Sequence, residues 1–174
     1  AAEDVAAVRL AVIGMGKCGA RELNYVSDVD VIYVHASDGL DEQTASGIAA
    51  VLGAGISRAI DSTGPEPGLW EVDANLRPEG KDGALSRTLE SHAAYYKRWA
   101  ASWEFQALLK ARAIAGDAAL GAEYEAMAAP LIWSSSERAG FVESVQGMRR
   151  RVTANIKPEE LSRQLKLGPG GLRD

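Results

Sequence analysis

The sequence is poor in cysteine, in long apolar runs and in surplus positive charge, and each shortage excludes a class of protein. Its one cysteine, Cys18, allows neither an intramolecular disulfide nor a cysteine zinc site, which favours a reducing cytoplasm. No apolar run approaches the roughly 20 residues of a transmembrane helix, so we expect no membrane partner. With 19 basic and 24 acidic residues the net charge is −5, which argues against a nucleic-acid partner.

The remaining composition is that of an ordinary globular protein. The 174 residues, 47% hydrophobic and 25% charged, suffice for a buried core. The first residues are acidic and do not resemble a signal peptide. The chain opens without methionine just before an apolar strand and closes on a glycine turn, so we interpret it as a segment of a longer protein.

The order of sequence patterns predicts an α+β protein. Short β-branched runs indicate strands at residues 8–13, 28–34 and 69–76. Helical patterns occupy residues 20–25, 47–61, 89–115, 120–132 and 137–156, and the third of these is one long helix or two consecutive helices. We therefore expect an α/β core over residues 1–85 and a helical region over residues 86–174.

A glycine turn follows the first predicted strand. Gly14, Gly16 and Gly19 match the dinucleotide fingerprint G-x-G-x-x-G. A Rossmann fold is excluded because the next helix is too short and because the nearest acids begin the second strand instead of ending it. The Walker pattern fails because Cys18 follows Lys17. The remaining interpretation is a turn that lets phosphates approach the backbone at a helix N-terminus.

Two carboxylates begin the second predicted strand. Because side chains alternate along a strand, Asp28 and Asp30 share one face, about 7 Å apart. Such a pair can hold divalent cations against the phosphates of a nucleotide, as two-metal nucleotidyl transfer requires. Alone, an Asp-x-Asp pair is commonly a solvated strand edge. The glycine turn before it favours the catalytic interpretation.

The third predicted strand supplies a further acid. Asp73, Asn75 and Arg77 share one face if residues 69–76 are extended. Asp73 would complete the metal site, and the guanidinium of Arg77 suits a phosphate oxygen. Two alternatives stay open: Glu71 lies on the same face and can replace Asp73 as a ligand, or Asp73 and Arg77 form an ordinary surface ion pair.

Four ordered blocks resemble one enzyme family. They are GMGKCGARELNYVSDVD at residues 14–30, VDANLRPEG at 72–80, WEFQALLKAR at 103–112 and KLGPGGLRD at 166–174. Together they resemble the bacterial glutamine synthetase adenylyltransferases, bifunctional enzymes that both attach and remove AMP. Details of the first two blocks are similar to actinobacterial members. The resemblance spans nearly the whole chain.

The resemblance implies a polymerase-β-like nucleotidyltransferase fold followed by a helical region. It implies that Asp28, Asp30 and Asp73 are catalytic and bind Mg²⁺ or Mn²⁺. The residues expected to contact nucleotide or phosphate are Gly14, Gly16, Lys17, Gly19, Ser27 and Arg77. The wider superfamily has Gly-Ser where this chain has Gly16-Lys17, a change that the glutamine synthetase branch shares. Glu104, Lys110 and Arg112 are further candidates to line the cleft.

The full-length members of this family carry two such domains. The tail at residues 166–174 resembles the N-terminal, adenylyl-removing copy, in which phosphate attacks an AMP-modified tyrosine of glutamine synthetase and ADP leaves. This implies ATP/ADP and phosphate as ligands, and a PII-type signal protein as a partner of the full-length enzyme. One alternative is the adenylylating copy, which transfers AMP from ATP to glutamine synthetase. Another is a non-catalytic regulatory module that binds a nucleotide.

Overall fold

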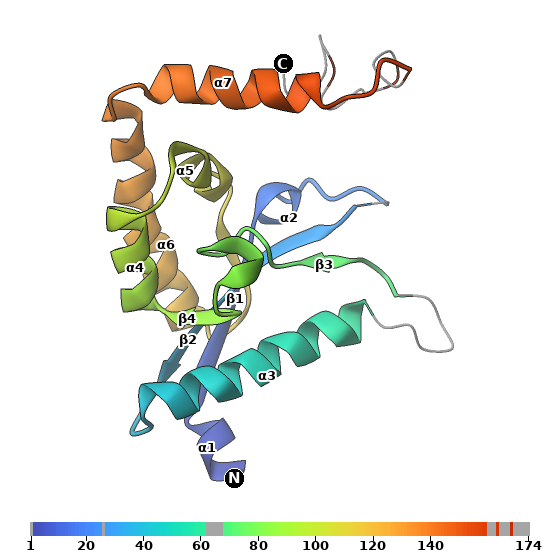
Figure 1. Cartoon of the computed structure of the whole chain (residues 1–174). Coiled ribbons are helices and arrows are strands. Elements are labelled where there is room, and N and C mark those ends of the chain that lie inside the picture. Colours follow the sequence, from blue (N-terminus) through green and yellow to red (C-terminus); the bar gives the residue numbers. More distant parts are fainter. Residues whose placement is uncertain (1, 26, 62–67, 160–162, 164–167, 169–174) are drawn as a thin grey trace. The chain divides into compact units, whose positions relative to one another are not determined.

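The computed structural model describes residues 2–25, 27–61, 68–159, 163 and 168 (Figure 1). The chain divides into two compact units, Ala1–Trp133 and Ser134–Asp174. All strands of the described residues lie in the first unit. In the second unit, the described helices are a 3₁₀ turn at Ser135–Glu137 and the helix α7 at Phe141–Ala154.

A mixed sheet of five strands forms the centre of the first unit. The strands are β1 (Val8–Gly14), β2 (Val29–Ser37), β3 (Val72–Asp73), β4 (Ser86–Thr88) and β5 (Arg112–Gly116). β1 lies between β2 and β5 and is antiparallel to both. β2 pairs in parallel with β3 near its start and with β4 further along. The small mixed sheet with its helices confirms the predicted α+β nucleotidyltransferase-like class.

Helices surround this sheet (Figure 1). They are α1 (Ala2–Ala6), α2 (Gly16–Ala20), α3 (Glu42–Ile60), α4 (Leu89–Arg98), α5 (Ser102–Leu108) and α6 (Ala118–Ser134), with a 3₁₀ turn at Gly80–Asp82. Asp41 caps the start of α3, because its side chain accepts a hydrogen bond from the backbone N–H of Thr44 at 2.9 Å. None of the helices among the described residues is long and apolar enough to span a bilayer.

Alternation along β2 builds a core on both faces of the sheet. Ile32 and Val34 are fully buried in the cluster that α4, α5 and α6 complete. Val31 and Tyr33 belong to a second cluster, which Ile56 of α3 joins. This period of two is the one expected for a strand that is covered on both sides. It leaves the two ends of β2 as the places where polar side chains can gather.

The third predicted strand is much shorter than expected. Only Val72 and Asp73 pair with β2, whereas strand had been predicted over residues 69–76. The chain turns because the Asp73 carboxylate accepts the backbone N–H of Asn75 at 2.7 Å and the backbone oxygen of Ala74 accepts the N–H of Arg77. Asp73, Asn75 and Arg77 therefore do not share one face of a strand, which corrects the prediction.

Residues 89–115 contain two helices and a strand. α4 and α5 confirm the interpretation as two consecutive helices, but residues 112–116 are β5 and not helix. β5 pairs with the edge of β1 that β2 leaves open, and this pairing satisfies backbone groups that would otherwise be buried without partners. The helix predicted at residues 20–25 is also displaced: α2 begins at Gly16 and ends before Arg21, which is left-handed with φ 61°.

Candidate functional site

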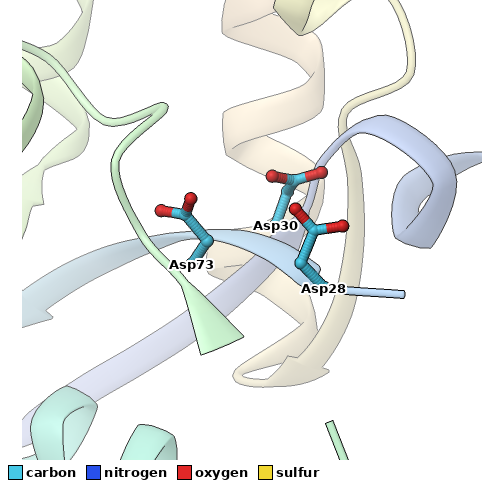
Figure 2. Close-up of side chains that lie close together, drawn as sticks. All are labelled: Asp28, Asp30 and Asp73. Atoms are coloured by element: carbon cyan, nitrogen blue, oxygen red, sulfur yellow. The ribbon is translucent and has the colours of Figure 1, made fainter. Parts of the chain in front are cut away.

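The three predicted carboxylates meet at one end of the β2–β3 pair (Figure 2). Asp28 directly precedes β2, Asp30 is its second residue, and Asp73 ends β3. Parallel pairing places Asp30 in register with Asp73. One oxygen of each carboxylate lies within 4.8 Å of the others. The register of the sheet thus brings together three acids that come from two separate parts of the chain.

This donor set fits a hard divalent cation. Oxygen ligands of Mg²⁺ bind at about 2.1 Å, so two ligands of one ion lie up to about 4.2 Å apart. The oxygens here lie within 4.8 Å, so small side-chain rotations complete the coordination. Three carboxylates this close repel one another, and a cation between them relieves that repulsion. Asp28 is exposed and the other two are half-buried, so a phosphate can approach from solvent.

The glycine turn packs directly against one of these acids. The backbone N–H of Met15 donates to the backbone oxygen of Asp30 at 2.8 Å, which ties the turn to β2. Gly16 has φ +49°, and a Cβ on it would lie 2.7 Å from Oδ2 of Asp30. The left-handed backbone favours glycine here, and a Cβ would push the Asp30 carboxylate aside. Gly16 therefore leaves room for the Asp30 carboxylate to face the site.

The two other glycines of the fingerprint face the sheet instead of the acids. A Cβ on Gly14 would lie 2.9 Å from Cγ2 of Ile114, a residue of β5. A Cβ on Gly19 would lie 1.8 Å from the backbone oxygen of Lys110, a contact that no side chain permits. These positions let α2 and β1 approach the chain around β5 closely. Their predicted contact with phosphate stays a prediction.

Lys17 and Ser27 lie beside the acids and contact each other. The Lys17 ammonium donates to Oγ of Ser27 at 3.3 Å and to Oδ1 of Asn24 at 3.4 Å. Ser27 directly precedes Asp28. The lysine thus links α2 to the segment that carries the first carboxylate. The predicted contacts of Lys17 and Ser27 with phosphate stay predictions.

Arg77 holds a loop together through its guanidinium group. It donates to the backbone oxygens of Ala74 at 2.8 Å, Lys81 at 3.0 Å and Gly83 at 3.1 Å. Burial lowers the pKa of Arg77, and the nearby Asp73 carboxylate acts in the opposite direction. The guanidinium has five N–H donors, so these bonds leave some for a phosphate. The hydrogen bonds of Arg77 stabilise the turn that follows Asp73.

Arg112 supports the glycine turn from the other side. Its guanidinium donates to the backbone oxygens of Gly19 at 2.8 Å and Cys18 at 3.3 Å. These carbonyls end α2, where a positive charge also complements the helix dipole. Burial raises the pKa of the Cys18 thiol, Arg112 lowers it and Asp30 raises it, so all three groups lie near one another. The sequence offered Arg112 only as one of several charges near the cleft.

The other two charged candidates have protein partners of their own. Lys110 forms an exposed ion pair with Glu22 at 2.6 Å. Glu104 is buried, and its Oε1 accepts the backbone N–H of Ala101 at 2.9 Å, which caps α5. Neither contact requires a ligand. Lys110 does bind the loop that leads toward Asp28.

A large cavity among the described residues lies at the opposite end of β2. It has a volume of about 600 Å³, and its lining includes His35, Glu42 and Glu123. Nδ1 of the buried His35 lies 2.9 Å from Oγ of Ser86, and burial lowers the pKa of the ring. The three aspartates are absent from its lining. The cavity therefore lacks the convergent carboxylates that two-metal chemistry requires, and these carboxylates lie at the start of β2 instead.

Comparison with known proteins identifies the same family that the four sequence blocks resemble. Residues 1–127 match a family model described as glutamate-ammonia ligase adenylyltransferase. The chain is 62% identical to a bifunctional glutamine synthetase adenylyltransferase/adenylyl-removing enzyme of Leifsonia xyli, over 98% of this chain and 17% of that protein. The enzymes of the same name from Streptomyces avermitilis and Mycobacterium tuberculosis are 60% and 55% identical, over 18% and 16% of their lengths. The chain thus spans less than a fifth of these relatives.

Proposed function

We propose that this chain, which belongs to the glutamate-ammonia ligase adenylyltransferase family, is the adenylyl-removing domain. It removes AMP from a modified tyrosine of glutamine synthetase by phosphorolysis and releases ADP. One observation carries the proposal: three carboxylates converge within 4.8 Å beside a turn whose left-handed backbone favours glycine. The name of the relatives covers both attachment and removal of AMP.

The residues of the site have distinct tasks under this proposal. Asp28, Asp30 and Asp73 hold Mg²⁺ or Mn²⁺, which when bound neutralises the charge that develops on the reacting phosphoryl group. Gly16 keeps the turn clear of Asp30. Lys17 supplies positive charge beside Ser27. Together they orient the phosphates, and for this chemistry positioning and electrostatics provide most of the catalysis.

The reaction balances without further reactants. An oxygen of inorganic phosphate attacks the α-phosphorus of the tyrosyl-AMP group and forms a new phosphorus–oxygen bond. The bond between that phosphorus and the tyrosine oxygen breaks, and the phenolate takes up a proton. The products are ADP and unmodified tyrosine.

The single cysteine is consistent with a cytoplasmic setting. A PII-type signal protein, expected from the family resemblance, is a predicted partner of the full-length enzyme.

The adenylylating copy is the second candidate, because the relatives' name includes that activity. The motif that favours the removing copy, at residues 166–174, lies outside the described residues except for Gly168. The catalytic acids themselves do not distinguish the two directions, since both transfer the same phosphoryl group. The reaction products do distinguish them.

The test uses the full-length protein with adenylylated glutamine synthetase, phosphate and Mg²⁺. We expect ADP to appear in step with the loss of protein-bound AMP. A variant carrying Asp28→Asn should release none, whereas Asp38→Asn, an exposed acid beyond the far end of β2, should behave as the unchanged protein. Transfer of AMP from ATP that depends on Asp28 would assign the adenylylating copy instead. Binding of ADP without Mg²⁺ and without turnover would indicate a regulatory module.

A further inference from the structure

Three large apolar side chains lie exposed close to the acids, and the proposed chemistry does not use them. Tyr25 is 103% exposed, Leu69 is 74% exposed and Trp70 is 37% exposed. None of them belongs to a hydrophobic cluster of the described residues. Phosphates and metal ions do not need apolar contacts. Large apolar side chains that are exposed within reach of a site can serve as an interaction surface. These three residues are called the apolar rim below.

The parallel pairing of β2 and β3 explains why the rim adjoins the acids. Both strands begin at the same end, and the backbone N–H of Val29 donates to the backbone oxygen of Glu71 at 2.8 Å. The segments that lead into the two strands therefore reach the sheet at one place (Figure 1). Asp28 and Asp73 stand at this same place (Figure 2).

Chain length limits how far the rim can lie from the acids. Tyr25 precedes Asp28 by three residues, and Trp70 precedes Asp73 by three. Since an extended chain spans at most about 3.6 Å per residue, the corresponding Cα atoms are no more than about 11 Å apart. The rim and the acids therefore fall within the footprint of one protein interface, about 800 Å² on each partner.

We propose that the apolar rim docks the polypeptide that flanks the AMP-bearing side chain of the protein substrate. This inference rests on the proposed function and adds the partner's chemistry: a folded protein that presents apolar residues beside the modified one. The adenine of the nucleotide is a less suitable occupant. Tyr25 and the Leu69–Trp70 pair come from two different segments, and one base offers too little surface to cover both.

The experiment compares a large and a small substrate of the full-length protein. The large one is adenylylated glutamine synthetase, and the small one is O-adenylyl-tyrosine amide, which carries the same bond without the flanking polypeptide. The combined rim variant carries Tyr25→Ala, Leu69→Ser and Trp70→Ala, which together remove the three exposed side chains. The matched control is Trp99→Ala, an aromatic residue that is 68% exposed and lies at the end of α4.

We expect the combined rim variant to raise KM for the protein substrate about tenfold, as for truncation of interface residues. Its kcat should stay within about twofold, and kcat/KM for the small substrate should not change, because the small substrate does not reach the rim. Retained turnover of the small substrate also shows that the variant is folded. Trp99→Ala should alter neither substrate. Protection of the 68–71 backbone from hydrogen exchange on addition of the protein substrate would support the same conclusion.

Three results would overturn the inference. An unchanged KM for the protein substrate shows that the rim does not dock it. An equal loss with both substrates shows that the rim contacts the nucleotide or tyrosine itself. Self-association of the unchanged protein that the rim variant loses assigns the surface to a second copy. If the unchanged protein releases ADP from neither substrate, the proposed function fails as well, which is a distinct outcome.

Discussion

The two ends of β2 carry polar side chains in opposite environments. At its start, Asp28 is exposed and Asp30 is half-buried, and Asp73 joins them from β3. At its other end, His35 is 2% exposed, and Oγ of Ser86 lies 2.9 Å from its Nδ1. Burial lowers the pKa of His35, which favours the neutral ring. The open end can bind cations and phosphates. At the closed end His35 itself lies in the core, although the cavity described above opens beside it.

Buried aromatic and polar side chains also lie near His35. His92 is 1% exposed, and its ring contacts those of Tyr96 and Tyr124, with centroids 5.9 Å and 5.3 Å away. The hydroxyl groups of these tyrosines lie 3.2 Å apart. Burial lowers the pKa of His92 to about 3. Polar groups thus contribute to packing around His35 and His92, whereas the acids at the other end are accessible to a ligand from solvent.

The largest expected effect concerns the open end. Asp30→Asn removes a charge from the acid cluster, and we expect more than about a hundredfold loss of ADP release, since one preorganised electrostatic group contributes about that much. The melting temperature should not fall, because the substitution relieves repulsion among the acids. Release of ADP is measured with Mg²⁺ present, and thermal denaturation is followed in parallel. Undiminished turnover would contradict the assignment of Asp30.

The closed end should instead determine stability toward acid. An unfolded histidine binds a proton below about pH 6.5. In the folded protein the pKa of His92 is lowered to about 3, so its ring stays neutral down to about pH 3. Protons therefore favour the unfolded state, and the free energy of unfolding falls by about 1.4 kcal/mol per pH unit between these values. His92→Gln should show a shallower fall over that range in urea titrations. Parallel pH profiles of the two proteins would refute this account.

Gly16→Ala has a smaller effect, and it tests how the glycine turn serves the open end. The left-handed backbone of Gly16 and the 2.7 Å approach of a Cβ to Asp30 Oδ2 predict a stability loss of about 1–2 kcal/mol. Affinity for Mg²⁺ should fall as the Asp30 carboxylate moves. The control is Gly47→Ala in α3, where nothing lies within 4 Å and a gain of about 0.5–1 kcal/mol is expected. Urea denaturation measures both, and a Gly16→Ala variant as stable as the parent protein would rule out the strain.

Much of the fold could be predicted because it depends on local patterns. The apolar run of β1, the alternation along β2 and the amphipathic α3 were all visible in the sequence. Residues 112–115 were predicted as the end of a helical stretch because residues 89–115 contain neither proline nor glycine. They form β5 because the backbone groups at the open edge of β1 need hydrogen-bond partners. This long-range requirement cannot be seen in the local sequence. The extent of β3 was likewise set by the hydrogen bond from the Asn75 backbone to Asp73.

Local sequence alone established the Gly14–Gly16 turn, its spacing from Asp28 and Asp30, and the presence of a third acid at Asp73. These depend on the allowed backbone of glycine and on the alternation of a strand, both of which act over a few residues. The register of Asp73 with Asp30 and the anchoring of α2 by Arg112 come from the tertiary structure. Both contacts join segments distant in the chain, and the hydrogen bonds of the whole sheet select their register.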